Sequence, residues 1–333
     1  MEQLLAARRR DNETAAPEGV ATQDHFREVK EAVESLAEQR QEPDAPPGID
    51  EALKQLSVGD TTAAEKIFRE VLDRRKAEGE TANKEAARPA RHLGALAFLY
   101  NTQKALDAYR EAVELDPDDP DGWNQLGQIL HRIGDLDEAE AAFGCVLGLG
   151  NRVEGNRVIA AATGNLGVIH LTRGDLDKSE EFHLKSLALH KELGHKEGMA
   201  SQYGNLGLIH RRRGDLDKAE ELHLKSLALE EDLGRKEGMA SDYGNLGLIH
   251  RTRGDLDKAE GFHLKSLALY EELGHKEGIA NQYGNLGTIR AQRDDTSGAC
   301  AYWAKAKALF LEIDAKDRVE QVGRAMVGAG CPE

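Results

Sequence analysis

The sequence predicts an all-α fold, an α-solenoid of about seven antiparallel helix pairs stacked one on the next. The first observation behind this prediction is a forty-residue unit that recurs almost unchanged from Gly164, Gly204 and Gly244 and opens again at Gly284. Units of about 20 to 50 residues mark arrays in which each unit buries its apolar face against its neighbours. The second observation is a glycine followed by aspartate in each near-identical copy, as at Gly214, where one helix should end and the next begin.

Small residues are expected where the two helices of a unit touch. Gly207 on the first helix and Ala219 on the second would let the two backbones approach closely. We expect Leu206, Leu224 and Leu227 to fill the space around them. The unit is therefore predicted to run as helix, tight turn, helix, tight turn.

The chain divides into four expected parts. Residues 1–21 are polar and are predicted to form a disordered tail. Residues 22–48 predict an amphipathic helix and then a proline-rich linker, and the apolar stripe of this helix consists of Phe26, Val29, Val33 and Leu36. The array of helix pairs is expected over 49–316. Residues 317–333 are expected to form a capping helix and tail, with an apolar stripe of Val319, Val322 and Met326.

Composition limits the classes of partner and compartment. The 333 residues carry 44 lysines and arginines against 60 aspartates and glutamates, a formal charge of -16, which disfavours binding to nucleic acid or to an anionic membrane. The sequence shows neither a signal peptide nor an apolar run of about 18 residues. Because Cys145, Cys300 and Cys331 are scattered without CxxC spacing, we predict neither a disulfide framework nor a zinc site, and favour a reducing cytoplasm.

One unit ahead of the near-identical copies carries large and small residues in a defined order. They are Trp123, Leu126, Gly127, Leu130, Gly134, Ala139 and Phe143, with Pro117 where the preceding unit should stop. On these residues the chain resembles the tetratricopeptide-repeat family. Its forty-residue units, in which NLG and GD recur, are similar to those of kinesin light chains and of Partner-of-Inscuteable-type adaptors. The resemblance implies a right-handed superhelix of helix pairs that binds other proteins.

Asparagine recurs at one position of the first helix in four successive units, as Asn165, Asn205, Asn245 and Asn285. Asparagine is a poor choice for a helix interior unless its amide has something to hold, because it competes with the backbone for hydrogen bonds. In the resembled adaptors the matching asparagine clamps the backbone of an extended peptide on the concave wall. The resemblance therefore implies that these four residues contact a peptide, with Asn124 or Gln125 as a weaker equivalent. The alternative is a ladder of amides satisfied by neighbouring repeats.

The same helix face changes from copy to copy. Leu171 and Thr172 become Arg211 and Arg212 in the next repeat, and Arg251 and Thr252 in the repeat after it. The candidates for binding acidic groups on a ligand are therefore Arg211, Arg212 and Arg251. Apolar contact would come from Val168, Leu208 and Leu248. The alternative for the arginines is a favourable interaction with the negative end of the helix dipole. We assign mainly that structural role to Arg173, Arg213, Arg253 and Arg293.

Histidine recurs in two columns, which are His170, His210 and His250, and His183, His223 and His263. A metal site would need several imidazoles to converge on one ion, so we favour half-buried structural histidines in place of the aromatic residues that the family uses for packing. The GNLG segment lies inside a helix and follows no strand, which excludes a phosphate-binding loop. We predict no enzyme activity, no metal and no cofactor.

These observations predict a cytoplasmic, non-enzymatic adaptor that binds a peptide segment of a partner protein, with acidic residues, in the concave groove of the superhelix. Two alternatives remain open: a self-assembling structural protein that joins copies through its end repeats or through residues 22–40, and a regulatory sensor that changes pitch when it binds a peptide. Residues 22–40 would cap the array, dimerise, or fold back as an autoinhibitor.

Overall fold

The computed structural model describes residues 48–57, 60–77, 80–98, 101–150 and 156–332. Every regular element within these ranges is a helix. They are α3 (Ile49–Ser57), α4 (Thr61–Ala77), α5 (Glu80–Phe98), α6 (Thr102–Leu115), α7 (Pro120–Ile133), α8 (Leu136–Leu149), α9 (Asn156–Arg173), α10 (Leu176–Glu192), α11 (Lys196–Arg213), α12 (Leu216–Asp232), α13 (Lys236–Thr252), α14 (Leu256–Leu273), α15 (Lys276–Gln292), α16 (Thr296–Glu312) and α17 (Lys316–Gly328). The predicted tail at 1–21 and helix at 22–40 lie outside the described residues.

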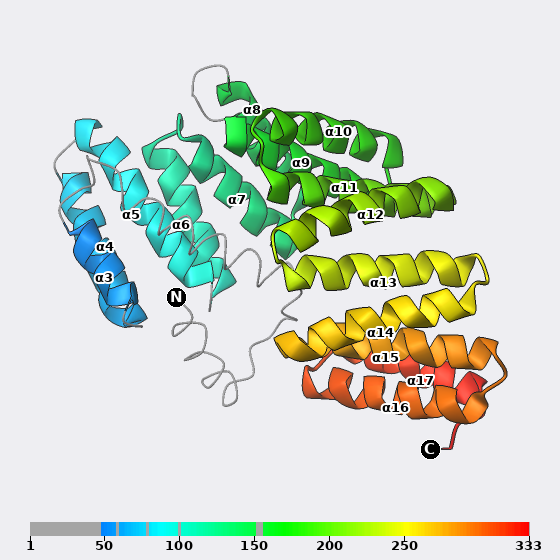
Figure 1. Ribbon diagram of the computed structural model, residues 1–333. Helices are drawn as coiled ribbons and strands as arrows, with labels where there is room; N and C mark the ends of the chain where they lie inside the picture. The colour runs from blue at the N-terminus through cyan, green and yellow to red at the C-terminus, as the bar shows by residue number, and fades with distance from the viewer. Residues whose placement is uncertain (1–47, 58–59, 78–79, 99–100, 151–155, 333) are drawn as a thin grey trace. The chain divides into compact units, whose positions relative to one another are not determined.

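The chain forms two compact units, an N-terminal unit up to residue 169 and a C-terminal unit from residue 170. In the N-terminal unit α3 packs on α4, α5 on α6 and α7 on α8 (Figure 1). In the C-terminal unit α11 packs on α12, α13 on α14 and α15 on α16, and the last helix, α17, packs on α16. In the sequence, α9 and α10 stand at the register of a further pair. The predicted all-α solenoid of about seven helix pairs is therefore confirmed, and none of the described helices is both long and apolar enough to cross a membrane.

The glycine–aspartate pair ends one helix and starts the next, as predicted. Gly214 follows α11 with φ 83° and ψ 3°, in the left-handed region that glycine adopts without a steric cost from Cβ. Asp215 precedes α12, and its Oδ1 accepts a hydrogen bond from the backbone N–H of Lys218 over 3.2 Å. Outside the near-identical copies, Asp294 and Asp314 occupy the left-handed position instead, with φ 60° and 54°.

An aromatic ring packs against a glycine where the two helices of a pair meet. A Cβ placed on Gly207 of α11 would lie 2.7 Å from the ring of His223 on α12. The same arrangement joins Gly94 to Tyr109, Gly127 to Phe143, Gly247 to His263 and Gly287 to Trp303. Leu206 and Leu227 are buried as expected, but the prediction for Leu224 is wrong, since 46% of it is exposed. The reason is that His223 takes the place against the glycine, which turns the next residue of the helix toward solvent.

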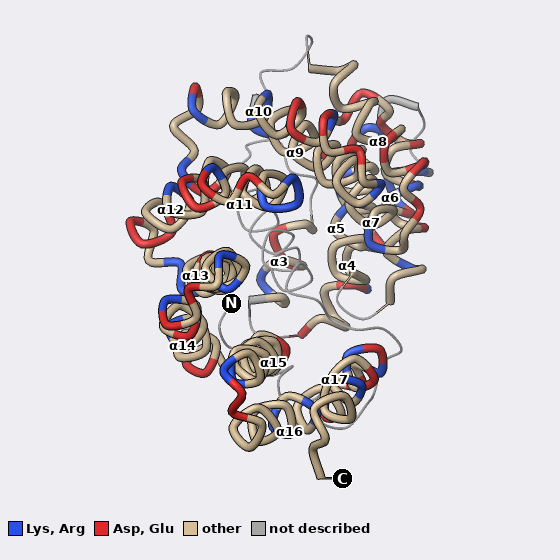
Figure 2. Tube along the Cα trace, turned by 90° about the vertical axis from the view of Figure 1, so that its right-hand side faces the viewer, with Lys and Arg blue, Asp and Glu red and all other residues tan. Residues whose placement is uncertain are grey.

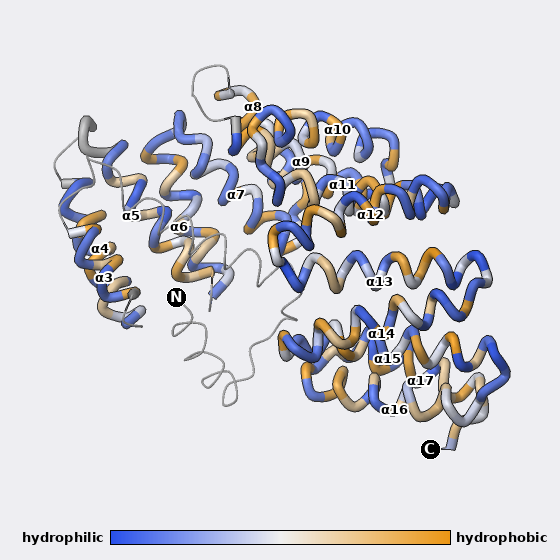
Figure 3. The backbone as a smooth tube through the Cα atoms, in the orientation of Figure 1, coloured by the Kyte–Doolittle hydropathy of each residue, from blue (hydrophilic) through white to orange (hydrophobic). Residues whose placement is uncertain are grey.

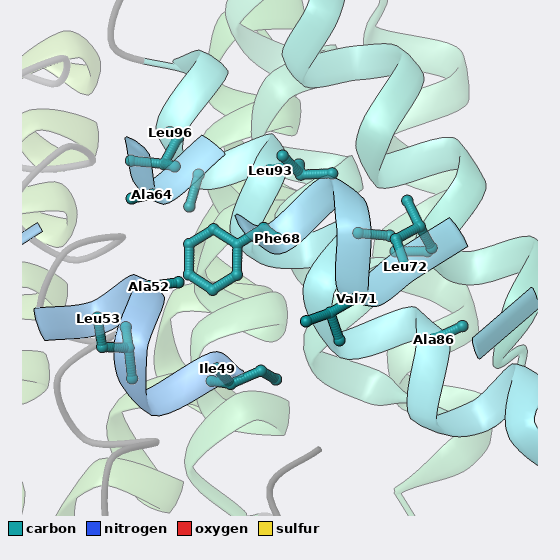
Figure 4. Close-up of a cluster of buried hydrophobic side chains, with 13 residues drawn as sticks. Ile49, Ala52, Leu53, Ala64, Phe68, Val71, Leu72, Ala86, Leu93 and Leu96 are labelled. Atoms are coloured by element: carbon teal, nitrogen blue, oxygen red, sulfur yellow. The ribbon is translucent and has the colours of Figure 1, made fainter. Parts of the chain in front are cut away.

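The core of the N-terminal unit begins at its first helices. Phe68 of α4 is fully buried and packs with Ala52 and Leu53 of α3 and with Leu93 of α5 (Figure 4). This ring fills the space between the first pair and the start of the second, so the short helix α3 is covered by apolar contacts despite its length.

The C-terminal unit has two layers of helices. Helices α11, α13 and α15 lie on the inner side of the curved unit, and α12, α14 and α16 lie on the outer side (Figure 2). Each inner helix contacts the next, α11 to α13 and α13 to α15. Apolar and polar residues alternate along these helices (Figure 3), as expected for elements that bury only part of their surface.

The predicted absence of a disulfide is wrong for two of the three cysteines. Cys300 on α16 and Cys331 beyond α17 form a disulfide, with Cα atoms 5.5 Å apart, whereas Cys145 is free and exposed. This pair could not be recognised in the sequence because 31 residues separate its members, and only the packing of α17 on α16 brings them together. The reducing cytoplasm stays a prediction.

Reduction of the Cys300–Cys331 disulfide is expected to loosen α17. The bond closes a loop across 31 residues, a constraint that contributes about 4 kcal/mol in chain-entropy estimates. Hydrogen exchange of the α17 amides should accelerate on addition of a dithiol and in Cys300→Ser, while exchange in α11 to α14 stays unchanged. Cys145→Ser is the control, and protection of α17 that is insensitive to the dithiol would contradict the prediction.

Candidate functional site

The predicted asparagines of the C-terminal unit lie on successive inner helices. Asn205 on α11, Asn245 on α13 and Asn285 on α15 are all half-buried. The Nδ2 of Asn245 donates to the backbone oxygen of Ser241 over 3.1 Å. Within the described part of the chain, the side chains of Asn205 and Asn285 make no hydrogen bond. Two of the three amides therefore keep a free donor and acceptor, and none is sealed in the core.

The other predicted amides belong to the N-terminal unit. Asn165 and Val168 are half-buried on α9. Asn124 and Gln125 lie on α7, where the side-chain oxygens of both are buried without a hydrogen-bond partner among the described residues. The predicted residues of α11, α13 and α15 thus come together in one unit, whereas those of α9 and α7 belong to the other.

Two of the three inner helices have a leucine at the register predicted for apolar contact. Leu208 of α11 and Leu248 of α13 are half-buried, and α15 has Thr288 at this register, with Oγ1 donating to the backbone oxygen of Gly284 over 3.0 Å. We call the predicted residues of this unit the amide–arginine face, which consists of Asn205, Leu208, Arg211, Arg212, Asn245, Leu248, Arg251 and Asn285.

Arg211 and Arg251 are half-buried near the C-terminal ends of α11 and α13, and the basic end of α11 is blue in Figure 2. Among the described residues, neither guanidinium has an ion-pair or hydrogen-bond partner, and the Nε of Arg211 is buried. Burial lowers the pKa of both side chains, and the positive charges of Arg212 and Arg251 lower the pKa of Arg211 further. The pair therefore consists of neighbouring, partly desolvated cations.

Arg212 makes a structural contact. Its side chain is exposed, and its Nη1 donates to the backbone oxygen of Leu171, at the end of α9, over 2.9 Å. Arg132 of α7 repeats this arrangement in the N-terminal unit, where it reaches the backbone oxygen of Phe98 over 3.5 Å and lies 4.6 Å from the centre of the Phe98 ring. An arginine at this register therefore forms a hydrogen bond with the C-terminal end of the first helix of the preceding pair.

The arginines one residue further along the first helix of a pair bind carboxylates on the second helix of the preceding pair. Arg213 has its Nη2 2.5 Å from Oδ1 of Asp177, and its Nη1 binds Glu180. Arg253 binds Asp217 and Glu220 in the same way, and Arg293 binds Asp257 and Glu260. The helix-dipole role predicted for these arginines is therefore incomplete, because each one also joins its own helix pair to the preceding helix pair.

One histidine column is fully buried rather than half-buried as predicted. The Nδ1 of His183 is 2.7 Å from Oε1 of Gln202, and that of His263 is 2.8 Å from Oε1 of Gln282. In the repeat between these two histidines, the Nδ1 of His223 is 2.9 Å from Oδ1 of Asp242. Sequence reasoning missed these partners, although the signal was present: a polar residue follows each histidine of this column 19 positions later.

The second column has carboxylate partners. The Nε2 of His210 is 3.3 Å from Oε1 of Glu180, and that of His250 is 3.2 Å from Oε1 of Glu220. Within the described ranges, no three or more His, Cys, Asp or Glu side chains come together in a way that could hold a metal ion. Both columns therefore have partners that belong to the packing between helices.

Two residue types that could suggest catalysis have structural bonds. Ser226 donates its hydroxyl to the backbone oxygen of Ala200 over 3.0 Å, inside the core. Asp215 caps α12, and Asp217 belongs to the ion pair with Arg253. These contacts occupy the groups that a nucleophile or an acid–base pair would need.

Comparison with protein families and solved structures agrees with this architecture. A family model described as tetratricopeptide repeat matches residues 120–192 and 198–272, and one described as TPR repeat matches 101–134. None of the curated proteins matches the sequence.

Several solved structures share the fold. The apo form of RapI has a TM-score of 0.63 at 16% identity, over 90% of this chain and 79% of that one. The Cut9–Hcn1 hetero-tetramer of the APC/C has a TM-score of 0.60 at 16% sequence identity, and the match covers 90% of this chain and 52% of that one. BtubC (BKLC) from P. vanneervenii has a TM-score of 0.55 at 20% sequence identity, and the match covers 68% of this chain and 92% of that one. At these identities the likeness concerns the fold alone. Since the repeat models together match half of the chain, the chain belongs to the tetratricopeptide-repeat family.

Proposed function

We propose that the protein is a non-enzymatic adaptor that binds a peptide segment of a partner protein along the amide–arginine face. Membership of a family whose fold suits protein–protein interaction gives the general class. The observation that carries the proposal is the pair Arg211 and Arg251, half-buried cations that no described acidic residue neutralises. Half-buried charge of this kind is costly unless a partner compensates it, and an acidic residue of a bound segment would do so.

The proposed mechanism is recognition without turnover. The side chains of Asn205 and Asn285 have both a donor and an acceptor available for the main chain of an extended segment, and Asn245 would exchange its bond to Ser241 for one to the ligand. Leu208 and Leu248 would supply apolar contact. Because a flexible segment loses conformational entropy when it binds, we expect a dissociation constant on the order of micromolar.

Replacement of Asn205 and Asn245 by alanine should remove the partner without unfolding the protein. Affinity capture with the tagged full chain, quantified by mass spectrometry, is expected to lose its specific proteins by about tenfold or more in the double variant, since each lost backbone hydrogen bond removes about 1 kcal/mol. Circular dichroism should be unchanged. The matched control is Gln103→Ala with Gln321→Ala, two exposed amides on α6 and α17. Equal recovery from the Asn205/Asn245 double variant and this control would reject the proposal.

Growth of the array by end-to-end stacking at α17 is disfavoured. Val327 of α17 stands at the register of Gly287 and is 80% exposed. In the pairs before it, the glycine at this place lies against a ring, and at Gly287 an added Cβ would come within 2.5 Å of Trp303. A further second helix would therefore collide with the valine side chain, which argues for an adaptor over a self-assembling structural protein at this end.

A further inference from the structure

Arg211 and Arg251 differ from the other arginines at the ends of the inner helices α11, α13 and α15. Those with carboxylate partners are Arg213, Arg253, Arg290 and Arg293. In a chain with 60 acidic residues, no described carboxylate lies against either Arg211 or Arg251. The two positive charges are therefore left for a ligand.

The surroundings of the pair keep the local charge positive. Arg212 is held beside Arg211 by its bond to the backbone oxygen of Leu171. His263, the titratable group that Arg251 influences, is buried and bonded to Gln282, and its low pKa keeps it neutral near pH 7. Neither neighbour supplies a negative charge, and the buried Nε of Arg211 adds a donor without an acceptor in the described residues.

A ligand group with two negative charges matches this pair better than one with a single charge. One carboxylate would neutralise one of the two guanidiniums, whereas a phosphate monoester carries about -1.5 to -2 at neutral pH and has three acceptor oxygens. Two planar guanidiniums offer forked donors that suit those oxygens. The favoured chemistry is therefore a phosphoryl group.

We propose that Arg211 and Arg251 form a subsite for a phosphoryl dianion, supplied by a phosphorylated residue of the bound partner segment. This proposal rests on the proposed function and specifies the chemistry of its ligand. The neighbouring units indicate how to remove the subsite, because Leu171 and Ala291 stand at the same register of α9 and α15. Arg211→Leu with Arg251→Ala therefore introduces residues that this position already accepts in the same chain.

The test uses the full chain and three short alanine–glycine peptides that differ in one central residue, which is phosphoserine, glutamate or serine. Binding is measured by NMR titration at fixed ionic strength, since charge-dependent binding is sensitive to salt. We expect the phosphoserine peptide to bind about tenfold more tightly than the glutamate peptide, and this preference to vanish in Arg211→Leu with Arg251→Ala. Arg318→Ala with Arg324→Ala, which removes two exposed charges from α17, is the matched control and should retain it.

Equal affinity for the phosphoserine and glutamate peptides would overturn the proposal, as would a preference that survives the Arg211/Arg251 double variant. A fourth titration with inorganic phosphate identifies the source of the group. If the free ion binds as tightly as the phosphopeptide, the assignment to a partner residue is overturned. These failures differ from failure of the adaptor function, which is judged by loss of captured protein in the Asn205/Asn245 double variant.

Discussion

Gly207→Ala is expected to lower the free energy of unfolding by about 2 kcal/mol, even though alanine is the better helix former. The added methyl group would lie 2.7 Å from the ring of His223, which is fully buried and bonded to Asp242. The ring therefore has no free space to enter, and α11 and α12 must move apart. Urea unfolding followed by circular dichroism measures the change.

Gly204→Ala is the matched control because it lies three residues earlier on the same helix. Its added Cβ would be 3.7 Å from the nearest atom, the Oγ of Ser226, which is an ordinary contact. Alanine there should raise stability by about 0.5–1 kcal/mol through its higher helix propensity. If both variants shifted stability in the same direction, the close approach at Gly207 would not be the cause.

Stability should fall as the pH is lowered from about 6.5 to 4, because the fold keeps buried histidines neutral. Burial lowers the pKa of His263 from 6.5 to about 4, although the bond to Gln282 opposes this shift. Above pH 6.5 the histidine is neutral in both states and the fold has its full stability. Between about pH 6.5 and pH 4, the histidine is protonated in the unfolded chain but remains mostly neutral in the folded chain. This residue alone therefore costs about 3 kcal/mol by pH 4.

Other buried histidines act in the same direction. Burial also lowers the pKa of His183 and, in the N-terminal unit, lowers that of His92 well below its usual value. To separate the histidine effect from acid titration of carboxylates, we compare the wild type with His263→Phe combined with Gln282→Leu in urea unfolding at pH 7.5, 6, 5 and 4. Trp303 at the same register shows that a larger ring is accommodated there. The double variant should lose less stability over this range, and an identical loss would contradict the assignment.

Much of the fold was predictable because its determinants are local and repeated. Gly214 and Asp215 specify a helix end and a helix start through backbone conformation and one capping bond, so their roles could be read without knowledge of any distant residue. The failure at Leu224 has the opposite origin. Both Leu224 and His223 are plausible packing residues by sequence, and the choice between them depends on the rotation of α12 against α11.

The candidate site was predictable in part. The repeat predicts that Asn205 and Asn245 occupy the same position on the first helix of their pairs. It does not predict that the adjacent arginines of α11 have different partners. Arg211 has no partner in the described residues, Arg212 braces Leu171, and Arg213 binds two carboxylates. Three arginines in a row point in different directions around the helix, so their partners come from different neighbouring elements.

The sequence by itself determined the helix pairs, their boundaries and the stacking of one unit on the next, since these depend on contacts within a unit and on a repeat that imposes the same contacts again. Only the tertiary structure decided which side chains remain available. The Cys300–Cys331 disulfide, the partners of the buried histidines and the unpaired state of Arg211 and Arg251 all depend on residues from different helices. Such contacts arise only when the helices have packed, because charge and hydrogen-bond satisfaction are properties of the surroundings rather than of the residue.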